Sequence, residues 1–272
     1  MSVVRQLLVS QLTAIELPPP ALIVAAAESE CAAAGIRMIP VVPGGAAYPL
    51  MGDAPLMRET LRAIADTGVT VSDLEIAILT PITDVARFRP FLEAGGRIGA
   101  RHVLVTGYDP DERRLTATFA ALCDEAAPFG LTADLEFLPW SNVPDLAAAI
   151  SIVGAAARPN AGVLIDPLHF ARSDSRVEDV ARVPRDWLHY WQICDAPRER
   201  PDTVEGLLHA ARAERLYPGE GGLDLVPLLR AMPSDLPISV EIPKAELART
   251  VPGRERVRMA ADATRAFLGR MA

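Results

Sequence analysis

The chain alternates between short apolar runs of strand length and longer segments whose apolar residues recur every three or four positions. Runs of the first kind predict buried strands, and segments of the second kind predict helices that pack one face against those strands. The predicted strands are residues 6–10, 37–42, 74–79, 102–106 and 132–136, a sixth that ends at Asp166, a seventh that ends near 192–195, and an eighth at 238–242.

The segments between these runs carry helix signals and their usual punctuation. Proline opens several of them and glycine closes several, as expected at helix ends. The predicted helices are residues 21–34 closed by Gly35, one opened by Pro55, 85–92 ended by Gly95 and Gly96, 115–126, one entered through Pro144, 177–183, one capped by Asp224, and 253–268; residues 198–222 form a long connection.

Eight strand–helix units follow one another in 272 residues without a compositional linker. This rhythm predicts a single (β/α)8 TIM barrel that spans residues 1–272 as one α/β domain. A doubly wound dinucleotide fold usually has a glycine-rich turn after its first strand. Here that turn, residues 11–14, has no glycine, so we do not expect such a fold.

Composition narrows the class of protein further. Half of the residues are hydrophobic and the net charge is −8, which favours a globular enzyme of small molecules and argues against nucleic-acid binding. Three cysteines lie far apart, without metal-site spacing, so we expect a reducing, cytoplasmic location. No uninterrupted apolar run reaches about 18 residues, so we expect no membrane span.

Oxygen-bearing side chains stand at the ends of four consecutive predicted strands. Glu136 ends the fifth, Asp166 the sixth and Glu241 the eighth, while Gln192 lies near the end of the seventh. Pro167 follows Asp166 and stops the strand there. In a closed parallel barrel the carboxyl ends of all strands surround one pocket, so these side chains are expected to converge.

Three ionised carboxylates cannot share one pocket without a countercharge. Two of them about 4 Å apart repel by roughly 4 kcal/mol at an effective dielectric near 20. Either one of Glu136, Asp166 and Glu241 takes up a proton, or a divalent cation lies between them. With Gln192 as a fourth, neutral oxygen, the set favours Mn²⁺ or Mg²⁺, and Co²⁺ or Zn²⁺ could also bind.

The ordered motifs of the C-terminal half resemble the xylose-isomerase-like TIM-barrel superfamily, and within it the sugar and sugar-phosphate isomerases and epimerases. The N-terminal half supports the resemblance only by its strand–helix rhythm. The motifs are Leu135-Glu136, Ile165-Asp166-Pro-Leu-His169, Gln192-Ile-Cys-Asp195-Ala-Pro-Arg198, Arg215-Leu-Tyr-Pro-Gly-Glu-Gly221 and Val240-Glu241.

The resemblance implies one divalent metal held by residues from the late strands. By position it implicates Glu136, Asp166, Gln192 and Glu241 as ligands, and Gln192 departs from the histidine found in many members. It also implies that His169, Arg198 and Arg215 bind substrate oxygens. Independently, Trp140 follows Glu136 closely and either walls the pocket or packs in the core.

These parts favour an isomerase or epimerase of a sugar or related hydroxy-ketone. The metal would acidify the C–H beside a carbonyl, and Glu136 and Glu241 would remove and return the proton through an enediolate. If a β-hydroxyl leaves instead, the enzyme is a lyase or dehydratase of an inosose- or dehydroshikimate-like ketone. A non-catalytic barrel is the third alternative. The expected partner is a small polyhydroxy substrate, and a homo-oligomer is possible.

A few remaining residues carry weaker expectations. Lys244 is expected to be a surface charge rather than a Schiff-base lysine, and Glu220 a turn residue or substrate contact. Asp195 is expected to orient Arg198 or a ligand, or to act as a cap. The other three histidines, His102, His189 and His209, show no partner spacing and are expected to be structural.

Overall fold

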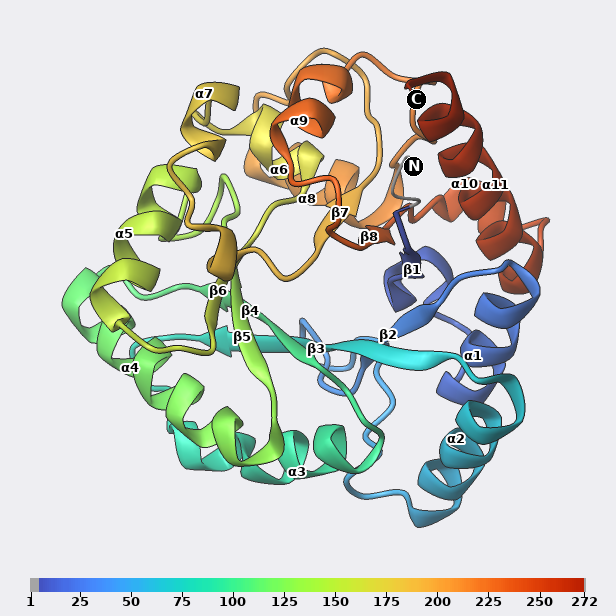
Figure 1. Cartoon of the computed structure of the whole chain (residues 1–272), viewed down its shortest axis with the longest axis horizontal. Coiled ribbons are helices and arrows are strands. Elements are labelled where there is room, and N and C mark those ends of the chain that lie inside the picture. Colours follow the sequence, from blue (N-terminus) through green and yellow to red (C-terminus); the bar gives the residue numbers. More distant parts are fainter. Residues whose placement is uncertain (1–4, 272) are drawn as a thin grey trace.

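A computed structural model describes residues 5–271 and shows a nearly closed barrel of parallel strands surrounded by helices (Figure 1). Its order, β6-β5-β4-β3-β2-β1-β8-β7, confirms the predicted (β/α)8 TIM barrel. The strands are β1 (Leu7–Val9), β2 (Ala33–Arg37), β3 (Thr70–Leu79), β4 (His102–Gly107), β5 (Thr132–Glu136), β6 (Ala161–Leu164), β7 (Trp191–Ile193) and β8 (Ile238–Val240).

The helices form the outer ring of Figure 1. They are α1 (Pro19–Glu28), α2 (Ala54–Thr67), α3 (Arg89–Arg97), α4 (Glu112–Ala126), α5 (Leu146–Ala156), α6 (Pro167–Arg172), α7 (Val177–Val180), α8 (Val204–Ala213), α9 (Leu225–Ala231), α10 (Ala245–Ala248) and α11 (Gly253–Met271). Short 3-10 turns are η1 (Gln11–Ala14), η2 (Val85–Phe88), η3 (Ala127–Phe129) and η4 (Arg185–Trp187). None of the helices in this described part of the chain is long and apolar enough to cross a bilayer.

The second strand lies earlier than the sequence predicts. The alanine-rich run was assigned to a helix over 21–34, but α1 ends at Glu28 and β2 covers Ala33–Arg37 instead of 37–42. In β2, Ala33 and Ala34 pair with both β1 and β3, so sheet pairing overrides the helix propensity of alanine. Gly35 is therefore not a helix cap: a Cβ there would lie 2.7 Å from Oδ2 of Asp73 inside the barrel.

Two helix assignments also change. The helix predicted to end at Gly95 and Gly96 continues to Arg97, so these glycines do not end it. A side chain at Gly95 would collide with Leu74 of β3. Glycine here allows α3 to approach the sheet closely. The connection 198–222, predicted without a helix, contains α8, whose buried Leu207 and Ala211 pack inward.

The barrel has an apolar outside and a partly polar inside. Ala133 and Leu135 of β5 belong to the large core between strands and helices, while Asp134 and Glu136 point the other way. The same alternation on β8 puts Ile238 and Val240 in the outer core and turns Ser239 to the inside of the barrel. The small apolar cluster inside the barrel comprises Leu8, Ala33, Ile76, Leu104, Leu164 and Tyr190.

The barrel is joined least tightly between its sixth and seventh strands, which lie at the two ends of the hydrogen-bonded order. Across this seam, the backbone N–H of Gln192 donates to the carbonyl oxygen of Ile165 at 3.0 Å. Gln192 and the end of β6 are therefore held side by side, beneath the pocket described next.

Candidate active site

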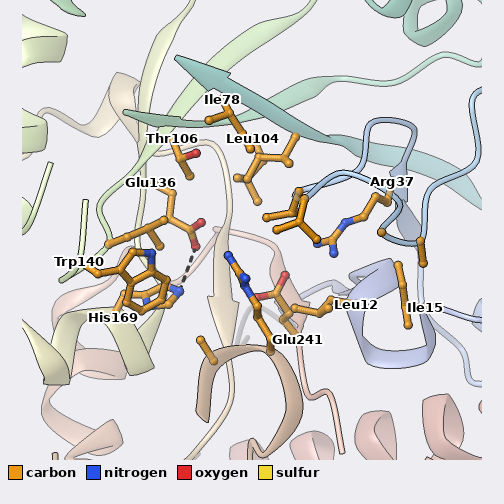
Figure 2. A pocket seen from close by; sticks show the side chains of 18 of the residues that line it. Leu12, Ile15, Arg37, Ile78, Leu104, Thr106, Glu136, Trp140, His169 and Glu241 are labelled. Carbon is orange, nitrogen blue, oxygen red and sulfur yellow. Dashed lines mark ion pairs between the residues drawn. The ribbon is translucent and has the colours of Figure 1, made fainter. Parts of the chain in front are cut away.

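A pocket of about 200 Å³ opens at the carboxyl ends of the strands. Figure 2 shows Glu136, His169 and Trp140 on one side and Arg37 on the other, with Glu241 between them. Much of the remaining lining is apolar and includes Leu12, Ile15, Val41, Val42 and Leu138.

Asp166 ends the sixth strand segment and also begins the next helix. Its Oδ1 accepts hydrogen bonds from the backbone N–H groups of Leu168 at 2.7 Å and His169 at 3.3 Å, which caps α6. Pro167 occupies the first turn, where its missing N–H costs nothing. The cap uses one carboxylate oxygen only, so Oδ2 remains available to face the site.

Arg215 supplies a countercharge that the sequence argument did not consider. The sequence predicted a proton or a divalent cation in this place. In the structure, Nη1 of Arg215 lies 2.5 Å from Oδ2 of Asp166 and Nη2 lies 2.8 Å from Oε2 of Glu241. Arg215 is only 2% exposed. The guanidinium lowers the pKa of Asp166 below its usual range against the opposing effect of burial.

Glu136 has no direct arginine partner among the described residues. Its Oε1 is buried and has no hydrogen-bond donor, and Nε2 of His169 is 3.9 Å away. Burial, followed by the charges of Glu241 and Asp166, raises the pKa of Glu136 well above its usual value. Burial lowers the pKa of His169 to about 4, so its imidazole is neutral at physiological pH.

Glu241 lies at the centre of a hydrogen-bond network. Its Oε1 accepts from the hydroxyl of Ser10 at 2.8 Å and from Nε2 of Gln192 at 2.8 Å. Burial raises the pKa of Glu241 to about 7, although the guanidinium of Arg215 acts in the opposite direction. Ser10 also lies 2.7 Å from Oε1 of Glu75, which is itself paired with Arg37 at 2.5 Å.

The donor groups fit a divalent cation. Donor atoms of Glu136, Asp166 and His169 all lie within 4.8 Å of one another. Oε1 of Gln192 is buried without a partner, as is Oε1 of Glu136, and such orphaned acceptors are costly unless a ligand satisfies them. Oδ2 of Asp166 and Oε2 of Glu241, the other two candidate ligand atoms, both contact Arg215.

The residues expected to bind substrate divide into two groups. His169, Arg215 and Trp140 line the pocket, whereas Arg198 is exposed and is not among the lining residues. The indole N–H of Trp140 donates to the hydroxyl of Tyr108 at 2.9 Å, and the ring meets His169 edge-on at 5.2 Å. Trp140 therefore forms a wall of the pocket while it packs partly against the core.

Asp195 neither orients Arg198 nor contacts a ligand residue. Its two oxygens accept from the backbone N–H groups of Gly219, Gly221 and Leu223 at 2.9, 3.0 and 3.1 Å, which fixes the Pro-Gly-Glu-Gly loop. Lys244 is not a free surface charge: it lies 3.7 Å from Glu220 and 4.4 Å from the ring centre of Tyr217.

Sequence reasoning missed the groups that support Glu241 from the early strands. Ser10 stands at the end of the first predicted strand, and Glu75 lies inside the buried third strand. A charged residue within an apolar run was the available signal for Glu75. Ser10 gave no such signal, because serine is common at strand ends and helix caps.

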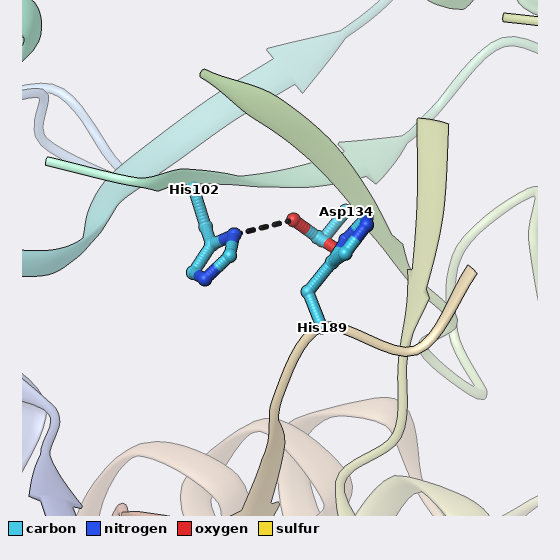
Figure 3. Close-up of side chains that lie close together, drawn as sticks. All are labelled: His102, Asp134 and His189. Carbon is cyan, nitrogen blue, oxygen red and sulfur yellow. Dashed lines mark hydrogen bonds and ion pairs between the residues drawn. The ribbon is translucent and has the colours of Figure 1, made fainter. Parts of the chain in front are cut away.

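A second cluster lies away from the pocket, where Asp134 faces the imidazoles of His102 and His189 (Figure 3). Nδ1 of His189 is 2.6 Å from Oδ1 of Asp134. The hydroxyl of Thr132 bridges the other side, 2.7 Å from Nδ1 of His102 and 2.6 Å from Oδ2 of Asp134. Because both oxygens of Asp134 are engaged, one by His189 and the other by the Thr132 hydroxyl, we interpret the cluster as a structural link between β5 and its neighbours at the amino end of the barrel.

Comparison with known proteins gives relatives with related chemistries. The chain is 24% identical to an inosose isomerase of Bacillus velezensis over 200 residues, which cover 68% of this chain and 69% of the relative. It is 31% identical to a 3-dehydroshikimate dehydratase of Pseudomonas aeruginosa over 109 residues, which are 40% of this chain but only 17% of that protein. The homologues are thus isomerases and dehydratases.

Solved structures share the fold. The IolI protein, crystallised with a bound zinc atom, matches with a TM-score of 0.78 at 19% identity, over 98% of this chain and 99% of that one. A family model described as xylose isomerase-like TIM barrel matches residues 29–267, most of the chain. The chain therefore belongs to the xylose isomerase-like TIM barrel family.

Proposed function

We propose that this chain is a divalent-metal-dependent isomerase or epimerase that moves a proton beside the carbonyl of a sugar or related hydroxy-ketone. The observation that carries the proposal is the pair Glu136 and Glu241. Both carboxylates line one pocket, both are buried, and the pKa of each is raised. Acids with raised pKa values in a cleft are suited to proton transfer near neutral pH.

Glu136, Asp166, Gln192 and Glu241 would hold the cation. A bound divalent ion supplies Lewis acidity, which makes the C–H beside a carbonyl easier to deprotonate. Mn²⁺ and Mg²⁺ suit this oxygen-rich set, and the zinc found in a related structure keeps Zn²⁺ open.

The carboxylates would then take and return the proton. Glu241, with a pKa of about 7, can hold or release a proton at little cost, and the Ser10 hydroxyl keeps its Oε1 in place. Glu136 faces the pocket from the opposite strands and would serve the other face of the substrate. The neutral imidazole of His169 and the wall formed by Trp140 would orient the substrate and exclude water.

A dehydratase is the second candidate, and the charge of the pocket favours it. Arg37, Arg212 and Arg215 all line the cavity. Together with a divalent cation they would outweigh the four nearby carboxylates, Glu75, Glu136, Asp166 and Glu241, by one positive charge. Such a pocket suits an anionic ketone of the dehydroshikimate type better than a neutral sugar or inosose.

We further infer a reducing, cytoplasmic setting, because Cys31, Cys123 and Cys194 are all buried free thiols. The net charge of −8 supports a small-molecule substrate rather than nucleic acid.

The test is α-proton exchange in D₂O with the metal-loaded protein, across ketoses, inososes and dehydroshikimate-type ketones. Wild-type protein should exchange the proton of one substrate class, and mass spectrometry of the product should distinguish rearrangement from loss of water. Glu241→Gln should keep the fold and lose exchange. Glu246→Gln, at an exposed site, is the matched control and should retain it. Metal binding without exchange in any class would identify a non-catalytic barrel.

A further inference from the structure

All three nitrogens of the Arg215 guanidinium have partners in the structure. Nε donates to the carbonyl oxygen of Ala211 at 2.9 Å, and Nη1 donates to Oδ2 of Asp166 and, at 3.2 Å, to the carbonyl oxygen of Glu241. Nη2 pairs with Oε2 of Glu241. The guanidinium therefore bridges two strands that have no ladder between them, at the centre of the proposed metal site.

The oxygens that Arg215 holds are the ones that a cation would need. Oδ1 of Asp166 is committed to capping α6, and Oε1 of Glu241 is committed to Ser10 and Gln192. Only Oδ2 of Asp166 and Oε2 of Glu241 remain, and both contact Arg215. A divalent cation and a guanidinium on the same two oxygens would repel each other strongly in a buried site.

The backbone of Arg215 is fixed, but its side chain has somewhere to go. The N–H of Arg215 donates to the carbonyl oxygen of Pro243 at 3.0 Å, and the next residue, Leu216, pairs with Asp195 at 2.8 Å. The side chain lines the pocket. Rotation about the side-chain bonds of Arg215 would move the guanidinium from the carboxylates toward the cavity, and the backbone contacts of the loop do not depend on the side chain.

We propose that Arg215 is an exchangeable internal cation: it neutralises Asp166 and Glu241 when no metal is bound and turns into the pocket when a divalent ion enters. The inference rests on the metal site of the proposed function. In the released position the guanidinium faces the substrate, so metal loading creates a substrate contact that the metal-free protein lacks. Metal then binds before substrate.

The experiment measures Mn²⁺ affinity by calorimetry and thermal unfolding, without substrate. Arg215→Met removes the charge while it keeps a long side chain. We expect its metal-free form to unfold at a lower temperature than wild type, to bind Mn²⁺ about tenfold or more tightly, and to gain more thermal stability from the ion. Arg215→Lys keeps a charge but loses the two-pronged geometry, so it should fall between the two.

Arg256→Met is the matched control. Arg256 is also buried and pairs with Glu16, but it does not line the pocket, so its loss should lower stability without changing the Mn²⁺ affinity. An unchanged or weaker affinity in folded Arg215→Met protein would overturn the proposal.

If Arg215→Met does not fold, the wild-type protein decides the question. A crystal structure with Mn²⁺ should show the guanidinium away from Asp166 and Glu241, and a guanidinium still bonded to both would contradict the exchange. These readouts involve no turnover. A chain that binds metal as described but exchanges no substrate proton would refute only the proposed function, and an active enzyme with unaltered Arg215→Met affinity would refute only the inference.

Discussion

The hydroxyl of Ser10 lies 2.8 Å from Oε1 of Glu241 and, at the same time, 2.7 Å from Oε1 of Glu75. A hydroxyl has one proton and can donate to only one of these carboxylates. The two carboxylates therefore compete for one donor, and Ser10 connects the proposed base Glu241 to the ion pair of Glu75 with Arg37.

Replacement of Ser10 by alanine should separate this role from simple packing. The hydrogen bond from Ser10 lowers the pKa of Glu241, so Ser10→Ala should raise that pKa and shift the acidic limb of the activity profile to higher pH. Stability should fall by about 1 kcal/mol, because a buried acceptor and a helix cap lose their partner. The measurements are the pH dependence of kcat/KM and urea unfolding.

Ser239→Ala is the control for Ser10→Ala. The Ser239 hydroxyl is also buried inside the barrel, two residues before Glu241, but it has no hydrogen-bond partner among the described residues. Its removal should leave the pH profile unchanged and stability unchanged or slightly higher. An equal pH shift in both variants would show that Ser10 acts only by filling space.

Gln192 should prove to be both a ligand and a support. Gln192→Met has a similar length but no oxygen, so metal affinity should fall by about tenfold, and Glu241 should lose the hydrogen bond from Nε2. Calorimetric titration with Mn²⁺ measures the first effect. Affinity equal to that of wild type would mean that the orphaned Oε1 of Gln192 faces a water or the substrate instead of the ion.

Stability of the metal-free protein should decrease as pH rises from about 6.5 to 8. An acid whose folded pKa is raised holds its proton in the folded state at pH values where the unfolded chain has lost it. The contribution of such an acid to the free energy of unfolding is complete below its unfolded pKa and is lost as the pH rises through its folded pKa. Asp73, Glu136 and Glu241 are such acids.

The expected fall in stability begins only near pH 6.5 because two buried histidines have the opposite effect below that pH. Burial lowers the pKa of His102 and His169 to about 4, so these two make stability increase with pH between about 4 and their unfolded pKa near 6.5, and oppose the acids there. Above that pH they are neutral in both states. His189, whose pKa is raised beside Asp134, acts in the same direction as the acids.

Each acid that is protonated in the folded state but ionised in the unfolded chain lowers the free energy of unfolding by about 1.4 kcal/mol per pH unit. Urea unfolding with a chelator present, at several pH values, measures the slope. Addition of Mn²⁺ should flatten it, because the ion replaces the protons as countercharge. A flat chelated profile would contradict the raised pKa values.

Gly162 should be intolerant of a side chain because of the cluster on the barrel floor. A Cβ at Gly162 of β6 would lie 2.6 Å from Nδ1 of His189 and would also collide with Asp134. Gly162→Ala should cost about 2 to 4 kcal/mol in thermal or urea unfolding, because it forces apart a buried charged hydrogen bond at the β6–β7 seam. Gly269→Ala, in α11 with open space around it, should be neutral or stabilising. Equal stability of both variants would show that the cluster does not fasten the seam.

The order of strands was accessible from the sequence because buried parallel strands leave short apolar runs and their helices leave a 3.6-residue period. Residues 132–136 were assigned without error, and the acids Glu136, Asp166 and Glu241 were recognised because each ends such a run. The helix assigned to 21–34 is correct only as far as Glu28, and residues 33–36 were misassigned. Their alanines and glycine fit a helix locally, and only pairing with two neighbouring strands makes them part of β2.

The sequence by itself thus determined the barrel and the acids that lie at the carboxyl ends of its strands. Both could be predicted because hydrophobic period and strand ends are local properties of the chain. Tertiary structure decided what neutralises those acids. Arg215 reaches Asp166 across 49 residues of chain, and Ser10 reaches Glu241 across 231. Contacts between side chains so far apart in sequence depend on closure of the barrel, and no local pattern records them.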